Sequence, residues 1–170
     1  MVNAIAQMLI DSGAIEFGDF VLASGARSRY YVDIKTATTN PVILGAIGKA
    51  IAETQEFEVV AGVAVGAVPV AVAVSLASGK PFAVIRKEEK EHGKSGAIIG
   101  NVRDKTVLLV EDVTTSGGSA LYGVETLRSA GARIDTVVTV VDREAGAFET
   151  FASHGVTLSA LVRISEVLDE

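Results

Sequence analysis

The sequence predicts an α/β fold in which a central, mostly parallel β-sheet is flanked by helices. Apolar, β-branched runs at 59–65, 106–110 and 136–141 support this prediction, and each leads into a turn and then a helical pattern. Strands joined through helices form parallel sheets with right-handed crossovers, so the turns that follow the strands gather at one edge. We therefore expect the chemistry of this chain at the carboxyl ends of its strands.

The composition fits one compact domain over residues 1–170. Of these residues 49% are hydrophobic, and a chain of this size buries roughly 70% of its unfolded surface. The net charge of −6 argues against non-specific binding to nucleic acid or membranes, which asks for a basic face. With no cysteine and two histidines, thiolate and histidine-built metal centres are excluded. No signal pattern and no run of about 18 apolar residues occurs, so we expect a cytoplasmic protein.

The first third of the chain predicts two helices separated by a hairpin. Helical spacing before Gly13 predicts the first helix. A Ser-Gly turn between two extended runs predicts the hairpin. Asn40 followed by Pro41 is typical of a helix start, with a cap and then a proline at the first helical position. The predicted elements are a helix over 2–12, strands at 20–22 and 30–34, and a helix from Pro41.

The strand at 59–65 runs into the turn Gly66-Ala67-Val68-Pro69 and an apolar helix that ends near Gly79. This turn has few polar side chains. It can be a tight packing turn or can bind a ligand through main-chain N–H groups, and the sequence leaves both interpretations open. A strand at 81–85 follows and ends in the charged stretch RKEEKEHGKSGAIIG, for which a solvated loop is the ordinary interpretation.

The stretch 106–119, TVLLVEDVTTSGGS, is the most informative part of the sequence. An apolar strand leads into Glu111 and Asp112, then into a turn rich in hydroxyls and glycine, and then into a helix. Gly117 and Gly118 let main-chain N–H groups approach a ligand, and the helix directs its positive end at the same point, so a phosphate fits there. Carboxylates would repel a phosphate, and we expect them to face sugar hydroxyls or a divalent cation.

The last third predicts a strand at 136–141 that ends in DREAGA, a short helix at 148–154, a strand at 156–164 and an acidic tail, SEVLDE. Arg143 follows the first of these strands. From the pattern alone it is either a surface arginine or part of the site at the strand ends.

VLLVEDVTTSGGS resembles the phosphoribosyl-diphosphate loop of the type I phosphoribosyltransferases. Neither GxxxxGK[ST] nor GxGxxG occurs in the chain, which separates this loop from a Walker A loop and a dinucleotide fingerprint. The N-terminal hairpin is similar to the hood of the orotate phosphoribosyltransferases, here residues 1–35, at Ser24, Gly25, Tyr30, Tyr31 and Asp33. Two positions depart from that family, since many of its bacterial members carry a lysine where this chain has Ala23, and a number of relatives carry one at Gly66.

The charged stretch matches the catalytic loop of the same family, a mobile loop over about 87–100, at Arg86, Lys87, Lys90, His92, Gly93 and Gly96. Arg143 takes the place of an arginine that pairs with the carboxylate of orotate, and a planar guanidinium suits such a bidentate contact.

The resemblance implies the type I phosphoribosyltransferase fold with a small N-terminal hood. It implies transfer of ribose 5-phosphate from 5-phospho-α-D-ribose 1-diphosphate to orotate, giving orotidine 5′-monophosphate and diphosphate in pyrimidine biosynthesis. The implied catalytic residues are Lys90, His92 and Asp112. The implied residues for phosphoribosyl diphosphate are Arg86, Lys87, Lys90, His92, Glu111, Asp112, Val113, Thr114, Thr115, Ser116, Gly117, Gly118 and Ser119. Thr115 and Arg143 are implied to hold orotate.

The resemblance also implies Mg²⁺, held mainly by the substrate diphosphate and ribose hydroxyls, with Glu111 and Asp112 as candidate ligands. It implies a homodimer in which the catalytic loop acts across the interface. Two alternatives stay open. A phosphoribosyltransferase for purine bases would share the cofactor loop, although the hood aromatics, the charged loop and Arg143 count against it. A non-catalytic regulator that binds nucleic acid would keep the fold, but the acidic balance counts against that.

Overall fold

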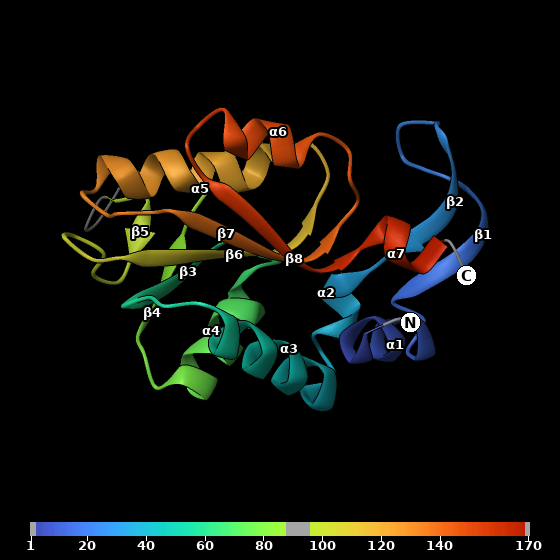
Figure 1. Ribbon diagram of the computed structural model, residues 1–170, viewed down its shortest axis with the longest axis horizontal. Coiled ribbons are helices and arrows are strands. Elements are labelled where there is room, and N and C mark those ends of the chain that lie inside the picture. Colours follow the sequence, from blue (N-terminus) through green and yellow to red (C-terminus); the bar gives the residue numbers. More distant parts are fainter. Residues whose placement is uncertain (1–2, 88–95, 169–170) are drawn as a thin grey trace.

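The computed structural model describes residues 3–87 and 96–168. Figure 1 shows a twisted central sheet with helices on both faces and a separate hairpin at one end. The sheet has six strands in the order β5-β4-β3-β6-β7-β8. These strands are β3 Val59–Val63, β4 Phe82–Ile85, β5 Ile98–Ile99, β6 Val107–Thr114, β7 Thr136–Asp142 and β8 Thr157–Arg163. All neighbours pair in parallel except β4 and β5, which are antiparallel.

Helices cover both faces of this sheet (Figure 1). On one face lie α3 Pro41–Thr54 and α4 Val68–Ser78, and on the other α5 Gly118–Ser129 and α6 Ala147–Ala152. The remaining helices are α1 Ala4–Asp11, α2 Ile34–Ala37 and α7 Ile164–Leu168. The N-terminal hairpin pairs β1 Ile15–Val21 with β2 Arg27–Val32 in an antiparallel arrangement. The predicted fold class, a mostly parallel sheet flanked by helices with a small hood, is confirmed.

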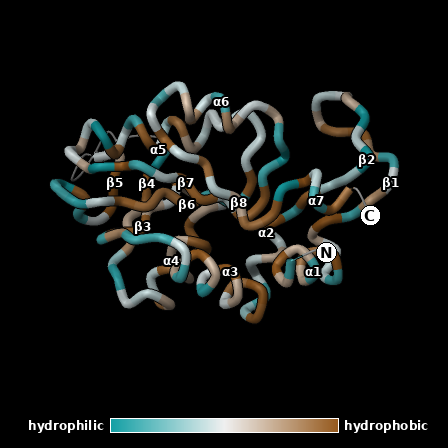
Figure 2. Tube along the Cα trace, viewed as in Figure 1, coloured by the Kyte–Doolittle hydropathy of each residue, from teal (hydrophilic) through white to brown (hydrophobic). Residues whose placement is uncertain are grey.

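Two apolar clusters, one on each face of the sheet, form the core. One joins the α3 and α4 side of the sheet to α1 and α7, and the other joins the sheet to α5 and α6. Figure 2 shows the hydrophobic residues concentrated along the strands between the helices. Every residue of β3 is buried, which explains why its sequence is continuously apolar. Two-sided burial therefore holds the central strands rigid beneath the loops at their carboxyl ends.

The predicted helix starting at Pro41 is confirmed, with Asn40 Oδ1 accepting hydrogen bonds from the N–H groups of Val42 and Ile43. Several details differ from the sequence prediction. The strand expected to end at 110 continues through both acids to Thr114. Ile34, expected in a strand, begins α2, because Asp33 caps that short helix. Residues 165–168 of the acidic tail belong to α7, in which Ile164 and Val167 are buried.

Candidate active site

The acid pair lies inside β6, near its carboxyl end. Glu111 and Asp112 are only 5% and 6% exposed. Oε1 of Glu111 accepts a hydrogen bond from the N–H of Asp112. Burial, together with the adjacent Asp112 carboxyl, raises the pKa of Glu111 to about 8. Glu111 is therefore mostly protonated near neutral pH, which reduces the repulsion that its carboxylate would exert on a bound phosphate.

Asp112 is joined to a second element of the chain. Its Oδ1 accepts the N–H of Val113 at 2.9 Å, while within the described residues no hydrogen bond reaches the buried Oδ2. The Nζ of Lys35, on α2, lies 3.2 Å from Oδ2 as an ion pair. This contact places a cation from the end of the hood directly at the acid pair.

The loop after β6 exposes the groups expected for a phosphate. Thr115, Ser116, Gly118 and Ser119 are exposed, and Gly118 begins α5. Gly117 has φ +86°, and a Cβ there would lie 3.2 Å from the Phe151 ring. Only glycine satisfies both conditions without strain. The N-terminus of α5 is thereby left open, with its first N–H groups free of side-chain caps.

Thr114 differs from the other hydroxyl residues of this loop. It is buried, and its Oγ1 donates a hydrogen bond to Oδ1 of Asp142 on β7 at 3.1 Å. The same Asp142 oxygen accepts the N–H of Glu144. Thr114 therefore fastens the base of the loop to the neighbouring strand, and the exposed hydroxyls are those of Thr115, Ser116 and Ser119.

Arg143 lies where β7 ends and meets the hood. Its Nε donates a hydrogen bond to the Tyr30 hydroxyl at 3.4 Å, and its guanidinium lies 5.2 Å from the centre of the Tyr30 ring. The N–H of Arg143 also donates to the carbonyl of Thr114. The structure thus brings together three predicted segments: the hood aromatics, the strand-end arginine and the loop after β6.

The stem of the charged loop is held from two sides. The N–H of Arg86 donates to the carbonyl of Ala97 at 2.7 Å, and β4 then pairs with β5. The Tyr122 hydroxyl, on α5, donates to the carbonyl of Arg86 at 2.9 Å. Lys87 is exposed. The predicted residues Lys90, His92 and Gly93 lie outside the described residues.

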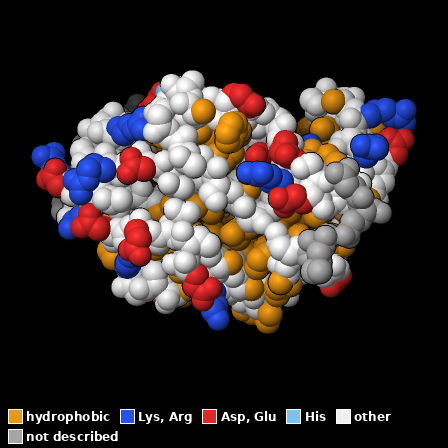
Figure 3. All heavy atoms as spheres, in the orientation of Figure 1, with side chains coloured by type: hydrophobic (Ala, Val, Ile, Leu, Met, Phe, Trp, Pro, Cys, Tyr) orange, Lys and Arg blue, Asp and Glu red, His pale blue; other side chains and the backbone are white. Residues whose placement is uncertain are grey.

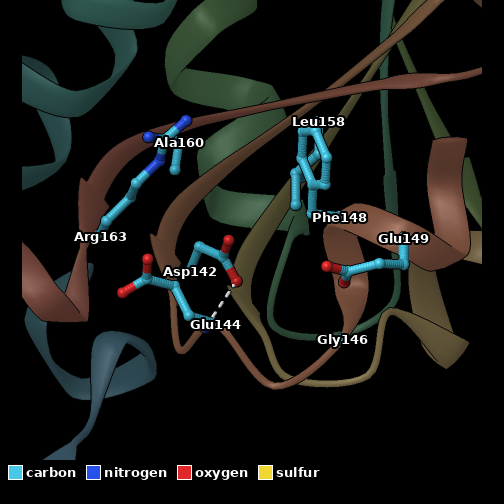
Figure 4. A pocket seen from close by; sticks show the side chains of 8 residues that line it. All are labelled: Asp142, Glu144, Gly146, Phe148, Glu149, Leu158, Ala160 and Arg163. Carbon is cyan, nitrogen blue, oxygen red and sulfur yellow. Dashed lines mark hydrogen bonds between the residues drawn. The ribbon is translucent and has the colours of Figure 1, made fainter.

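A pocket of about 380 Å³ lies at the ends of β7 and β8 (Figure 4). Asp142, Glu144 and Glu149 line it, with Arg163 the one cation among its lining residues. Two of these acids have internal partners, since Asp142 accepts from Thr114 and Glu144 accepts from the N–H of Ser165. Three acids repel a phosphate, so this pocket does not suit the anion that the loop after β6 suits.

The donor set at the acid pair fits a metal ion carried by the substrate. Within residues 3–87 and 96–168, no group of three or more His, Cys, Asp or Glu side chains could hold a metal. Mg²⁺ commonly takes one or two carboxylates and completes its shell with phosphate oxygens and water. Glu111 and Asp112 can supply that protein share.

Two participants were not predicted from the sequence, Lys35 and Asp142. Lys35 is one of many charged surface residues in the pattern, and only the fold brings it to β6. Asp142 had a weak signal, because it follows an apolar strand directly. A buried acid at a strand end is a candidate for fixing an adjacent loop, but the sequence does not indicate which loop.

Comparisons with known proteins agree with this geometry. Residues 34–163 match the phosphoribosyl transferase domain. A protein of Methanoculleus marisnigri named orotate phosphoribosyltransferase is 73% identical over 169 residues, which cover 99% of both chains. The crystal structure of orotate phosphoribosyltransferase from Aeropyrum pernix is similar to this structure, with a TM-score of 0.83 and 32% identity, covering 97% of this chain and 96% of that chain.

A structure of the Mycobacterium tuberculosis orotate phosphoribosyltransferase in complex with 5-phospho-α-D-ribosyl 1-diphosphate is also similar. Its TM-score is 0.72 with 32% identity, covering 87% of this chain and 88% of that chain. The fold and the family match define this chain as a phosphoribosyltransferase. At the identities found over nearly its full length, it belongs to the orotate phosphoribosyltransferase family. The family resemblance predicted from the sequence is confirmed. Among the described residues no helix is long and apolar enough to cross a membrane.

Proposed function

We propose that this protein transfers the ribose 5-phosphate of phosphoribosyl diphosphate to N1 of orotate, giving orotidine 5′-monophosphate and diphosphate. One observation carries the proposal: the acid pair and glycine loop of β6 share a sheet edge with the contact between Arg143 and Tyr30. The first feature suits a ribose phosphate, and the second offers a guanidinium beside an aromatic ring. The named activity of the similar proteins supports orotate as the base.

The loop after β6 is assigned to the 5′-phosphate. Main-chain N–H groups of 115–119 and the exposed hydroxyls of Thr115, Ser116 and Ser119 supply charge-assisted hydrogen bonds of roughly 1.5–3 kcal/mol each. Thr114 is buried and bonded to Asp142, so it fixes the start of this loop, and Val113 before it has no side-chain hydroxyl to offer. Glu111 and Asp112 are assigned to the ribose hydroxyls. Because the pKa of Glu111 is raised to about 8, its protonated carboxyl can donate a hydrogen bond to a diol as well as accept one.

The charged loop is assigned to the leaving diphosphate. As the bond to the anomeric carbon breaks, negative charge gathers on the diphosphate, and preorganised cations stabilise that charge. Arg86, Lys87, Lys90 and His92 are the candidate donors, and Lys90 and His92 are assigned from the resemblance alone.

Arg143 and Thr115 are assigned to orotate. A guanidinium can hold a carboxylate through two parallel hydrogen bonds, which an ammonium cannot do. Tyr30 restrains Arg143 from the hood side, so the arginine has a defined orientation before the base binds.

Mg²⁺ is proposed to enter with phosphoribosyl diphosphate. When bound, it would neutralise part of the diphosphate charge, with Glu111 and Asp112 as the candidate protein ligands. The remaining ligands would come from the diphosphate, the ribose hydroxyls and water.

A homodimer is proposed as the working form, with the charged loop of one subunit reaching the site of the other. Exposed apolar side chains on the α3 and α4 side support an interface, because Val42 is 69% and Leu76 is 81% exposed. Figure 3 shows hydrophobic side chains gathered on the lower part of this view, where Figure 1 places α3. A cytoplasmic location is proposed because phosphoribosyl diphosphate is too highly charged to cross a lipid bilayer unaided.

The test follows the loss of orotate absorbance after phosphoribosyl diphosphate and Mg²⁺ are added, coupled to orotidylate decarboxylase. The wild-type protein is expected to consume orotate, and Lys90→Ala to do so about 10²–10³ times more slowly. Lys49→Ala, an exposed lysine on α3, is the control and should match the wild type. Consumption of adenine, guanine or xanthine with orotate left untouched would overturn the pyrimidine assignment.

A further inference from the structure

Lys35 lies where three separate segments of the chain meet. It is carried by α2, and its Nζ is 3.2 Å from Oδ2 of Asp112 on β6. Beneath its stem is Gly66, in the turn after β3. A Cβ at Gly66 would lie 3.0 Å from Cε of Lys35 and inside the van der Waals contact distance of Asp112 Oδ2. The missing side chain at position 66 therefore leaves the space that the Lys35 stem and the Asp112 carboxylate occupy.

The Lys35 ammonium is positioned for a further ligand. Its side chain is 67% exposed, whereas the Asp112 side chain is 8% exposed, so the pair has one buried and one open end. An ammonium has three donors, and Asp112 contacts it through a single oxygen, Oδ2. Because most of the side chain is exposed, the ammonium remains accessible to a ligand, and its Cε lies next to Gly66 in the turn after β3.

The other described cations near the site have other partners. The guanidinium of Arg143 is engaged with Tyr30, and Arg86 donates through Nη1 to the carbonyl of Gly96. A diphosphate that binds near Glu111 and Asp112 needs a nearby cation to offset their charge. Lys35 is the described cation that already contacts this pair.

We propose that Lys35 binds the diphosphate group of phosphoribosyl diphosphate, held at the turn after β3 by Asp112 in the space that Gly66 leaves open. This inference rests on the proposed function, because it assigns a residue to the substrate of that reaction. Asp112 thereby has two roles. It orients the lysine when the site is empty, and it faces the ribose when the site is filled.

The experiment compares Lys35→Met with Lys49→Met. Methionine keeps most of the lysine stem and removes the charge, and Lys49 also forms an exposed ion pair with a carboxylate, that of Glu53. We expect Lys35→Met to weaken the binding of inorganic diphosphate, measured by calorimetry, by about tenfold to 100-fold, the range for one charge-assisted hydrogen bond. The KM for phosphoribosyl diphosphate should rise similarly, while the KM for orotate changes less than about twofold. Lys35→Arg should retain most of the affinity.

A merely structural lysine would give a different result. In that case Lys35→Met would lower the melting temperature and leave the diphosphate affinity equal to that of Lys49→Met, which would overturn the proposal. If the wild-type protein does not consume orotate, the proposed function fails. The calorimetric titration with diphosphate still decides the role of Lys35, because it requires no turnover.

Discussion

The carboxyl group of Glu111 shows how a buried strand controls protonation at the scale of one residue. The folded protein holds its proton up to about pH 8, whereas the ordinary value for a glutamate is 4.5. Because the folded-state pKa is the higher one, the stabilising contribution is fully present below the unfolded pKa and is lost as pH rises through the folded pKa. Between these values stability falls by up to about 1.4 kcal/mol per pH unit.

Glu111→Gln should remove this dependence. We expect the free energy of unfolding, measured with urea at several pH values between about 5 and 8, to fall less steeply in the variant than in the wild type. Glu125→Gln on α5 makes the same chemical substitution at an exposed carboxyl and should keep the wild-type slope. Equal slopes for Glu111→Gln and the wild type would show that Glu111 is ionised in the folded protein.

Gly117 gives a second prediction at the residue scale. In Gly117→Ala, the new Cβ is disfavoured both by the left-handed φ of +86° and by its close contact with the Phe151 ring. We expect a loss of about 1–3 kcal/mol of stability and weaker binding of phosphoribosyl diphosphate, since the loop must shift. Gly79→Ala is the matched control, because Gly79 has φ +71° at the end of α4 with nothing within 4 Å of a Cβ. It should lose a similar or smaller amount of stability and keep the substrate affinity of the wild type.

At the scale of elements, α5 and β4 jointly hold the stem of the charged loop through the Tyr122 hydroxyl. Tyr122→Phe removes the hydrogen bond to the carbonyl of Arg86 and little else. We expect a loss of about 0.5–1.5 kcal/mol of stability and a severalfold lower kcat, because a loosened stem positions the loop less well. Thr126→Ala removes a hydrogen bond to a carbonyl within α5 and is the control. If kcat were unchanged in Tyr122→Phe, the hydrogen bond that holds the stem of the charged loop would have no role in catalysis.

The sequence predicted helices and strands best where a local pattern, such as a continuous apolar run or a helix-capping residue, specifies the element. The central strands were predictable because burial on both faces requires continuous apolar runs, and α3 because Asn40 and Pro41 mark its start. The extension of β6 through Glu111 and Asp112 was not predictable, since acidic residues ordinarily mark the end of a buried strand. Here a raised pKa and an ion pair with Lys35 make their burial possible. Two-residue β5 was missed because its pairing with β4 depends on tertiary contact.

At the scale of the whole molecule, the site is assembled from segments far apart in the chain. Tyr30 and Arg143 are 113 residues apart in the sequence, and the fold brings them into contact. The loop after β6 was predictable as a phosphate site, since its strand, glycines and helix are contiguous in sequence. Two other contacts were not predictable, because no local sequence pattern specifies which partner the fold supplies. These are the contacts of Lys35 with Asp112 and of Thr114 with Asp142.

The proposed exchange of loops between subunits gives the last prediction. Lys90→Ala disables the charged loop, and Asp112→Asn disables the acid pair, so each variant alone should be nearly inactive. If the loop acts across the interface of a dimer, a mixed dimer holds one site with both defects and one site with neither. Equal mixing after subunit exchange forms mixed dimers in about half of the molecules, which restores about a quarter of the wild-type rate.

A loop that acts within its own subunit would leave every site with one defect, whatever the mixture. Mixing would then restore nothing, and the measured rate would equal the mean of the two variants. Sedimentation of each variant must first show dimers, because monomeric variants would also recover no activity on mixing. Exchange is checked by mass spectrometry of one isotopically labelled partner, so that a missing recovery is attributed to the loop and not to slow mixing.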